Sequence, residues 1–137
     1  MKKILSALII FFLCTLNISA HCKFDPEKFR AEIHQFITSS ANLTGKEADN
    51  FFPLYDEMKA KQQKLHKQLR NYQRSTPTSN AAARNVILKI DDLNFRIKRI
   101  EKEYHDRMLK KLPAMKLNAA LKAERKFYRQ YFRRVAK

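Results

Sequence analysis

Only one glycine, Gly45, occurs in this chain of 137 residues. Glycine provides the tight turns and the close backbone approach to ligands on which P-loops, dinucleotide-binding fingerprints and nucleophile elbows depend. Each of these motifs needs at least two glycines at fixed spacing, so the sequence excludes all three. Tryptophan is absent and β-hairpin turn signals are scarce. We therefore predict an all-α fold.

Helix caps and apolar periodicity predict four helices. Asp25 is a good N-cap for the first helix, Pro26 fits its first position, and we expect the polar residues from Thr38 to Asn42 to end it. The residues from Arg74 to Asn80 form the one clear linker. The predicted helices run from about Pro26 to Ile37, from the Thr44 cap to about Tyr72, from about Ala81 to Lys111, and from about Ala114 to Val135.

The start of the second helix is the best local signal in the chain. Thr44 is followed three residues later by Glu47, which is the spacing of a capping box. Pro53 falls inside the same helix, where it removes an amide donor and crowds the preceding turn. We therefore expect a bend near Asp49 to Pro53.

The third helix carries the longest apolar stripe, which advances by three or four residues from Val86 to Met108. This spacing is close to a heptad seam and requires a partner helix. Two helices of roughly thirty residues would each be ~45 Å long at ~1.5 Å per residue. We therefore predict an elongated four-helix protomer with two long helices. Its stripes could be covered by folding back or by a second copy, and we favour a homodimer.

The first twenty residues have the pattern of a cleavable signal peptide. Lys2 and Lys3 form a basic start, Ile4 to Leu16 is uncharged and apolar, and Ala20 is the small residue at the predicted cleavage site. A membrane anchor is the competing interpretation, but the apolar run is shorter than the ~20 residues of a spanning helix. We predict export to the periplasm and a single mature domain of residues 21–137.

The formal net charge is +16, and removal of the two signal lysines leaves +14. In the cytoplasm this charge would suggest nucleic acid, because lysine and arginine release counterions from phosphates. Export argues against nucleic acid as a partner and favours acidic or unfolded polypeptides, anionic lipids or acidic glycans. The alternative is that the charge mainly keeps the protein soluble.

The potential metal ligands and catalytic groups show no recognisable arrangement. Cys14 would be lost with the signal peptide, which leaves Cys22 without a cysteine partner in the mature chain. We favour a Cys22 that lies in an N-terminal tail and has no essential role. A disulfide between the Cys22 residues of two copies and a lipid anchor on Cys22 are the less favoured alternatives. The histidines at 21, 34, 66 and 105 form no HxxxH pair. No acid pairs with a histidine or serine in a catalytic pattern. We predict a non-enzymatic protein with no cofactor and no metal site.

Leu43-Thr44-Gly45-Lys46-Glu47 at the start of a long helix, in a small, basic, exported chain, resembles the LTxxQ superfamily of periplasmic proteins, which includes the Spy-like and CpxP-like members. The stretches from Leu43 to Lys61 and from Lys110 to Phe127 are similar to a branch of that family with a degenerate second motif. Glu47 replaces the expected glutamine, and Leu117-Asn118 replaces a second Leu-Thr pair.

The resemblance implies an antiparallel, cradle-like helical dimer whose concave face binds unfolded or misfolded polypeptides without ATP during envelope stress. CpxP-like members also restrain the extracytoplasmic domain of a stress-sensor kinase, and other relatives bind metals. Chaperone-like binding is therefore our first functional hypothesis. A sensor regulator and a metal-sensing or metal-resistance protein are the alternatives.

Two groups of basic residues are candidate client-binding sites. The first group flanks the apolar stripe of the third helix, and the second lies in a segment of the fourth helix that is rich in arginine and aromatic residues. The alternative to client binding for the first group is a helix face that is simply exposed to solvent. For the second group, the alternative is that its aromatic residues pack in the core. The second segment could also lie on an anionic membrane, which we do not favour. The candidates are Lys89, Arg96, Arg99, Arg125, Arg129 and Arg133.

Overall fold

The computed structural model describes residues 24–136, and the predicted signal peptide and Cys22 lie outside them. The described part of the chain contains four α-helices and no strand, which confirms the all-α prediction. The helices are α1 (Pro26–Ser40), α2 (Gly45–Gln73), α3 (Asn80–Leu109) and α4 (Ala114–Val135).

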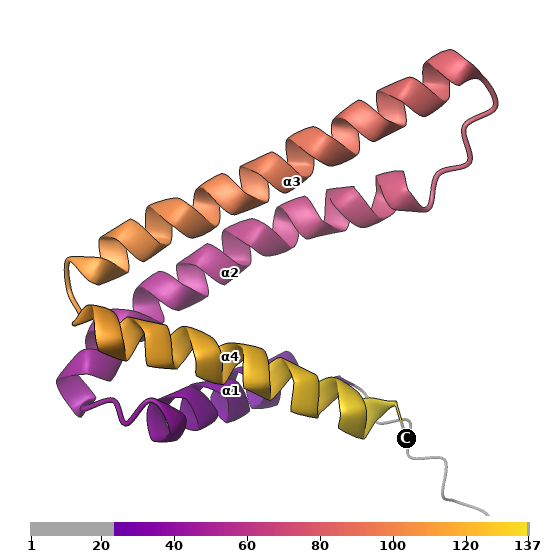
Figure 1. Cartoon of the computed structure of the whole chain (residues 1–137). Coiled ribbons are helices and arrows are strands. Elements are labelled where there is room, and N and C mark those ends of the chain that lie inside the picture. Colours follow the sequence, from indigo (N-terminus) through magenta and orange to yellow (C-terminus); the bar gives the residue numbers. More distant parts are fainter. Residues whose placement is uncertain (1–23, 137) are drawn as a thin grey trace, which may run out of the picture.

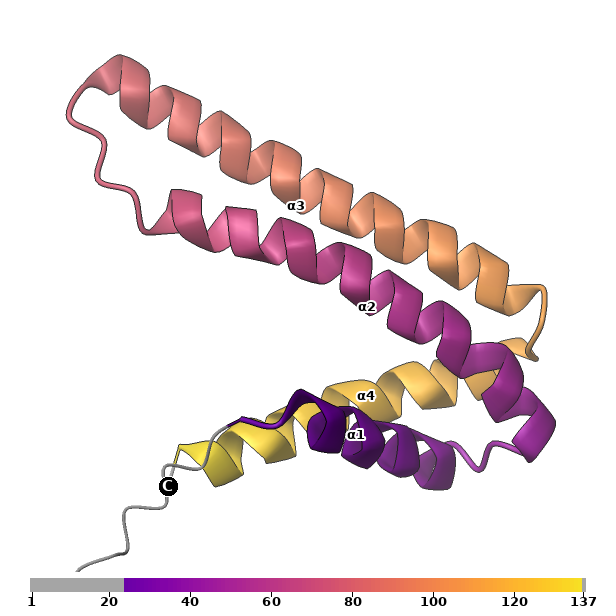
Figure 2. The same cartoon turned by 180° about the vertical axis from the view of Figure 1, so that it is seen from behind.

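The four helices form two pairs. Figures 1 and 2 show α2 and α3 as a long antiparallel hairpin and α1 beside α4, with the two pairs meeting at one end and diverging toward the other. The connections α1–α2 and α3–α4 lie at the shared end, and the connection α2–α3 lies at the far tip of the hairpin. The arrangement therefore leaves the outer half of the hairpin uncovered by α1 and α4.

Side-chain caps begin three of the helices. The carboxylate of Asp25 accepts hydrogen bonds from two backbone amides of α1, Thr44 forms a complete capping box with Glu47, and Ser79 caps α3. Pro113 precedes α4 without a side-chain cap. The two caps predicted from the sequence, Asp25 and Thr44, thus correctly placed the starts of α1 and α2.

The predicted end of α1 at Ile37 is three residues early, since α1 continues to Ser40. The Ser39 hydroxyl donates to the carbonyl groups of Gln35 and Phe36, at 3.0 and 3.1 Å, so it bonds to the helix instead of breaking it. Asn42 then turns the chain with a φ of 49°, a left-handed conformation that asparagine tolerates.

Helix α2 continues through Pro53. Figures 1 and 2 show its first turns inclined to the rest of the helix. This direction change brings the start of α2 against α1, where the His34 ring stacks on Phe52 with centroids 4.0 Å apart. The His34 Nε2 atom also lies 2.8 Å from the Asp56 carboxylate. An aromatic contact and a hydrogen bond therefore join α1 to α2.

The buried apolar residues form two separate clusters. The larger cluster lies where the helix pairs meet and takes residues from all four helices, including Ile37, Phe51, Tyr104 and Phe127. The smaller cluster lies within the outer hairpin and consists of Leu65, Leu69, Leu93 and Ile97.

Gln62 is the one buried polar side chain among the described residues. It lies on α2 between Met58 of the larger cluster and Leu65 of the smaller one, and its amide nitrogen is 3.5 Å from the Ile97 carbonyl oxygen. On α2, a side chain that prefers water therefore lies between the two clusters, whereas Ile100 of α3 packs against both.

The periodicity of the fourth helix predicts one apolar face with Arg134 pointing away from it, and the structure shows this face to be partly wrong. The predicted face consists of Leu117, Leu121, Tyr128, Tyr131, Phe132 and Val135. Phe127 is a core residue that the predicted stripe omits, whereas Phe132 and Val135 are exposed. Arg134, predicted to point away from the apolar face, instead lies 3.8 Å from Glu32 of α1 and covers the Tyr131 ring. The reason is that α4 packs on α1 rather than on the hairpin along most of its length.

Candidate functional site

The residues that carry the resemblance to the LTxxQ motif are Leu43, Thr44 and Glu47, and they lie where the α1–α2 connection meets the start of α4. The Thr44 amide donates to the Glu47 carboxylate at 2.8 Å, and the Glu47 amide donates to the Thr44 hydroxyl at 3.2 Å. Lys116 of α4 lies 3.6 Å from the same carboxylate and donates to the Asn42 carbonyl. Leu43 is buried. These contacts position helices and offer no binding surface.

The pKa of Glu47 is lowered, first by the backbone hydrogen bond from Thr44 and then by Lys116. Glutamate at this position therefore provides both the reciprocal cap and a charge that holds the start of α4. Glu47, which occupies the position of the glutamine in the LTxxQ motif, thus has a structural partner, Lys116, in this chain.

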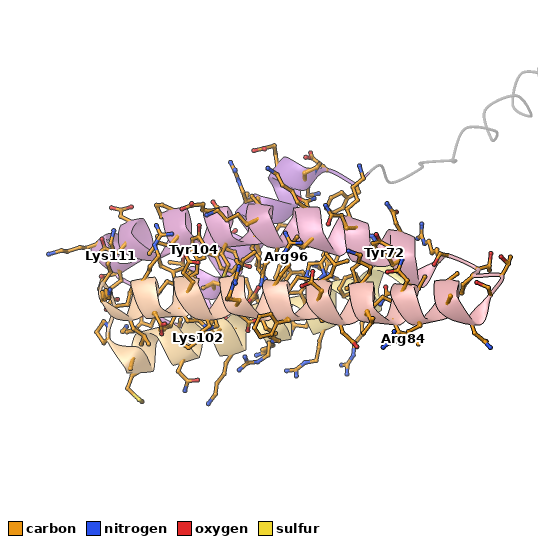
Figure 3. The ribbon with its side chains drawn as sticks, turned by 90° about the horizontal axis from the view of Figure 1, so that it is seen from above. Tyr72, Arg84, Arg96, Lys102, Tyr104 and Lys111 are labelled. Atoms are coloured by element: carbon orange, nitrogen blue, oxygen red, sulfur yellow. The ribbon has the colours of Figure 1, made fainter. Side chains whose placement is uncertain are left out.

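A groove on the α2–α3 hairpin combines cations with an apolar floor. It has a volume of about 360 Å³, and Leu65 and Ile100 contribute its apolar surface. Figure 3 looks onto this side of the hairpin, with Arg96 and Tyr104 between the two ribbons and α1 and α4 behind them. The lining of this basic groove consists of Lys61, Lys64, Leu65, Gln68, Arg96, Arg99 and Ile100.

The cations of the basic groove are only partly balanced. Lys61 lies 3.3 Å from a carboxylate oxygen of Glu57, and Arg96 lies 3.8 Å from one of Asp92. Within the described residues, Lys64 and Arg99 have no carboxylate oxygen within the 4.0 Å that defines an ion pair. The groove therefore has free positive charge for an anionic ligand.

A cation–aromatic cluster closes one end of the basic groove. The fully buried Tyr104 ring has the Lys61 ammonium 5.1 Å and the Arg107 guanidinium 4.5 Å from its centroid. Its hydroxyl has no hydrogen-bond partner in good geometry among residues 24–136. This hydroxyl and then Lys61 nevertheless lower the pKa of the nearby Glu57 carboxyl. The cluster fixes the Lys61 side chain at the groove edge.

An exposed apolar strip adjoins the basic groove on α3. Leu88 and Phe95 are 53% and 66% exposed, and Phe95 lies four residues before Arg99, which makes the two side chains neighbours on the helix surface. Ile87 is also exposed nearby. Cationic and apolar side chains therefore occur next to each other on the outer hairpin.

The structure divides the six predicted client-binding residues between two surfaces. Arg96 and Arg99 line the basic groove, and Lys89 is exposed two turns earlier on α3. Arg125, Arg129 and Arg133 are exposed on α4 and do not line this groove.

The groove also contains two cations of α2, Lys61 and Lys64, which the sequence analysis did not identify as candidates. Their signal was present, because they flank the α2 stripe of Met58, Leu65 and Leu69 as the arginines flank the α3 stripe. Only the pairing of α2 with α3 shows that the two sets face the same side.

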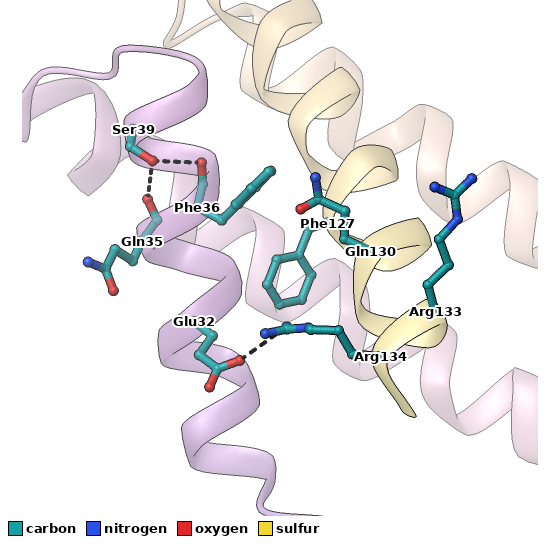
Figure 4. A pocket seen from close by; sticks show the side chains of 8 residues that line it. All are labelled: Glu32, Gln35, Phe36, Ser39, Phe127, Gln130, Arg133 and Arg134. Atoms are coloured by element: carbon teal, nitrogen blue, oxygen red, sulfur yellow. Dashed lines mark hydrogen bonds and ion pairs between the residues drawn. The ribbon is translucent and has the colours of Figure 1, made fainter. Parts of the chain in front are cut away.

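A second groove lies between α1 and α4, with a volume of about 640 Å³. Figure 4 shows Phe36 and Phe127 projecting from the two helices, with the ion pair between Glu32 and Arg134 beside them. The full lining is Glu32, Gln35, Phe36, Ser39, Phe127, Gln130, Arg133 and Arg134. Arg133 is thus the one predicted client-binding residue in this groove.

Within residues 24–136, no cluster of three or more His, Cys, Asp or Glu side chains has a geometry suited to a metal ion. A search of the same residues for a helix with the length and apolar character of a membrane span also finds none.

Comparison of the chain with family models, with curated proteins and with solved structures yields no match.

Proposed function

We propose that this chain is an exported, non-catalytic, chaperone-like protein of the LTxxQ type, which binds unfolded or misfolded polypeptides in the periplasm without ATP. The basic groove carries this proposal. Four cations from two helices, Lys61, Lys64, Arg96 and Arg99, surround an apolar floor there. The proposal further rests on the sequence features of the first twenty residues and on the capped helix start at Thr44.

The groove suits a ligand that is held loosely. Lysine and arginine attract acidic segments over a long range and speed the encounter. The floor residues Leu65 and Ile100 then provide small apolar contacts. Because no deep pocket encloses the bound segment, its affinity stays low enough for a folding chain to leave. This combination is appropriate for many unrelated clients.

We also propose that two copies form an elongated, antiparallel, cradle-like homodimer. The support is the exposed strip on α3, where Ile87, Leu88 and Phe95 leave apolar surface uncovered in the single chain. Sedimentation equilibrium over a range of concentrations tests this proposal. We expect a dimer that Phe95→Ser converts to monomer, and a monomer at every concentration would contradict it.

A client-aggregation assay tests the proposed function. The chain without its first twenty residues is mixed with a chemically denatured protein that aggregates on dilution, and light scattering is followed. We expect protection at equimolar or lower ratio at low salt, and weaker protection as salt screens the groove. The double variant Lys64→Glu, Arg99→Glu should lose most of the protection. Neither residue forms an ion pair in the described structure, so the fold should tolerate the change.

The matched control is Lys67→Glu with Arg84→Glu, which changes the net charge equally within the same hairpin. Figure 3 shows Arg84 on the far side of α3 from Arg96, and both control residues lie outside the basic groove. We expect the control to protect clients almost as well as the wild type. Absence of protection by the wild type at any ratio would remove the proposal. Equal loss in both variants would assign the effect to net charge and not to the groove.

A further inference from the structure

The free end of α4 carries an exposed surface that the proposed function does not use. Phe132 and Val135 are 62% and 66% exposed. Ring contacts connect Phe132 to Tyr128 at 6.2 Å, Tyr128 to Phe29 at 5.9 Å, and Phe29 to Phe24 at 5.5 Å between centroids. Phe24 is itself 61% exposed. A continuous aromatic surface therefore extends from the end of α4 to Phe24, two residues before α1.

Cations border this aromatic surface along one side of α4. Arg125, Arg129 and Arg133 are spaced by four residues, so they form one row on the helix, and Phe132 is three residues from Arg129. In the described structure none of these three arginines has a carboxylate oxygen within 4.0 Å. Residues 125–137 include no aspartate or glutamate. The row therefore complements a surface with many negative charges.

The shape of this surface favours a bilayer over a polypeptide. Neither of the two grooves includes Phe24, Phe132 or Val135, so these side chains protrude and do not line a channel for an extended chain. Protruding aromatic rings that flank basic side chains suit the boundary between lipid headgroups and acyl chains. The rings enter the boundary and the guanidinium groups reach the phosphates.

We propose that the C-terminal half of α4, together with Phe24, docks on an anionic lipid bilayer. The docked helix would lie along the membrane surface and leave the basic groove of the hairpin free. The proposal is independent of client binding, because it uses a different helix and different cations. It would place a polypeptide-binding protein next to a membrane.

Vesicle sedimentation tests the docking. The chain without its first twenty residues is incubated with vesicles of phosphatidylcholine alone or with added phosphatidylglycerol, and bound protein is measured in the pellet. We expect binding only to the anionic vesicles and release by salt. At roughly fivefold in affinity for each basic residue near an anionic surface, Arg125→Gln, Arg129→Gln, Arg133→Gln should weaken binding by roughly 100-fold. Phe132→Ser with Val135→Ser should weaken binding by about tenfold or more.

The matched control is Lys89→Gln, Arg96→Gln, Arg99→Gln, which removes the same charge from the hairpin and should change vesicle binding little. Circular dichroism verifies that every variant is folded. Absence of binding to anionic vesicles at low salt would overturn the proposal, as would equal loss in the control. Full binding by the serine variant would also overturn it, since charge alone would then explain adsorption. Loss of client protection without loss of vesicle binding in the α4 arginine variant would identify a polypeptide site instead.

Discussion

Replacement of Gln62 by methionine should stabilise the protein. Gln62 is only 7% exposed and lies in the seam between α2 and α3, beside Leu65. Its amide offers two N–H donors and an oxygen with two lone pairs, yet its single hydrogen bond to the Ile97 carbonyl is 3.5 Å long. A bond of this length is at the limit of hydrogen bonding, so the buried amide is only weakly satisfied.

The size of the effect follows from this burial. A buried amide without a partner costs about 1–3 kcal/mol in protein substitution data. The only fully enclosed side-chain nitrogen or oxygen without a partner among the described residues is the Tyr104 hydroxyl oxygen, so the amide oxygen of Gln62 retains some contact with solvent. The lower end of the range therefore applies. Methionine has a similar shape and a similar helix propensity, and we expect Gln62→Met to raise the free energy of unfolding by about 1 kcal/mol.

Urea unfolding followed by circular dichroism measures this change. The midpoint should rise while the slope stays constant, because the surface exposed on unfolding hardly changes. Gln62→Glu is the matched control: it keeps the shape but buries a charge, and should lower stability by about 2 kcal/mol. A neutral or destabilising Gln62→Met would refute the reasoning. It would mean that the amide makes good hydrogen bonds in solution.

Three further changes test the junction and the core. Thr44→Ala should cost about 1 kcal/mol in urea unfolding, because the first turn of α2 loses its cap. The folded pKa of Glu47 lies below the ordinary 4.5, so its stabilising effect is present above that pH and is lost as the pH falls through the lower folded value. Glu47→Gln should therefore reduce the loss of stability between neutral and acid pH, and an unchanged acid profile would count against this role. Tyr55→Phe removes a 3.0 Å hydrogen bond to Glu124 and should lower the unfolding free energy by about 1.5 kcal/mol. An unchanged midpoint would show that this bond is not formed in solution.

Local sequence signals predicted the helices well because their causes are local. The caps at Asp25 and Thr44 and the linker before α3 each act within a few residues, so they correctly placed the element boundaries. The end of α1 was placed too early because serine has two roles. Its hydroxyl can end a helix or bond to the preceding turn, and the burial of Ile37 and Ala41 against other helices favours continuation here.

The candidate sites depend on which helices pack against each other. The apolar pattern of a single helix does not identify its partner. The apolar stripe of α3 indicated that Arg96 and Arg99 flank a seam, but Lys61 and Lys64 join them only because α2 is the partner. Similarly, the periodicity of α4 fits packing on either of two neighbours. Its contact with α1 buries Phe127 and exposes the residues near the C-terminus.

The uneven core gives the two halves of the hairpin different properties. Near the junction, residues from four helices surround Tyr104, whereas the outer half is held by four buried aliphatic side chains and interrupted by Gln62. Regions with few buried apolar contacts open locally at lower free energy than the rest of a protein. The basic groove overlies this less stable half, because Leu65 belongs to both the groove floor and the small cluster. A surface that can adjust its shape at low cost would suit the clients of varied sequence that the proposed function requires. We therefore interpret the polar residue in the seam as a determinant of groove flexibility, retained at a cost in stability.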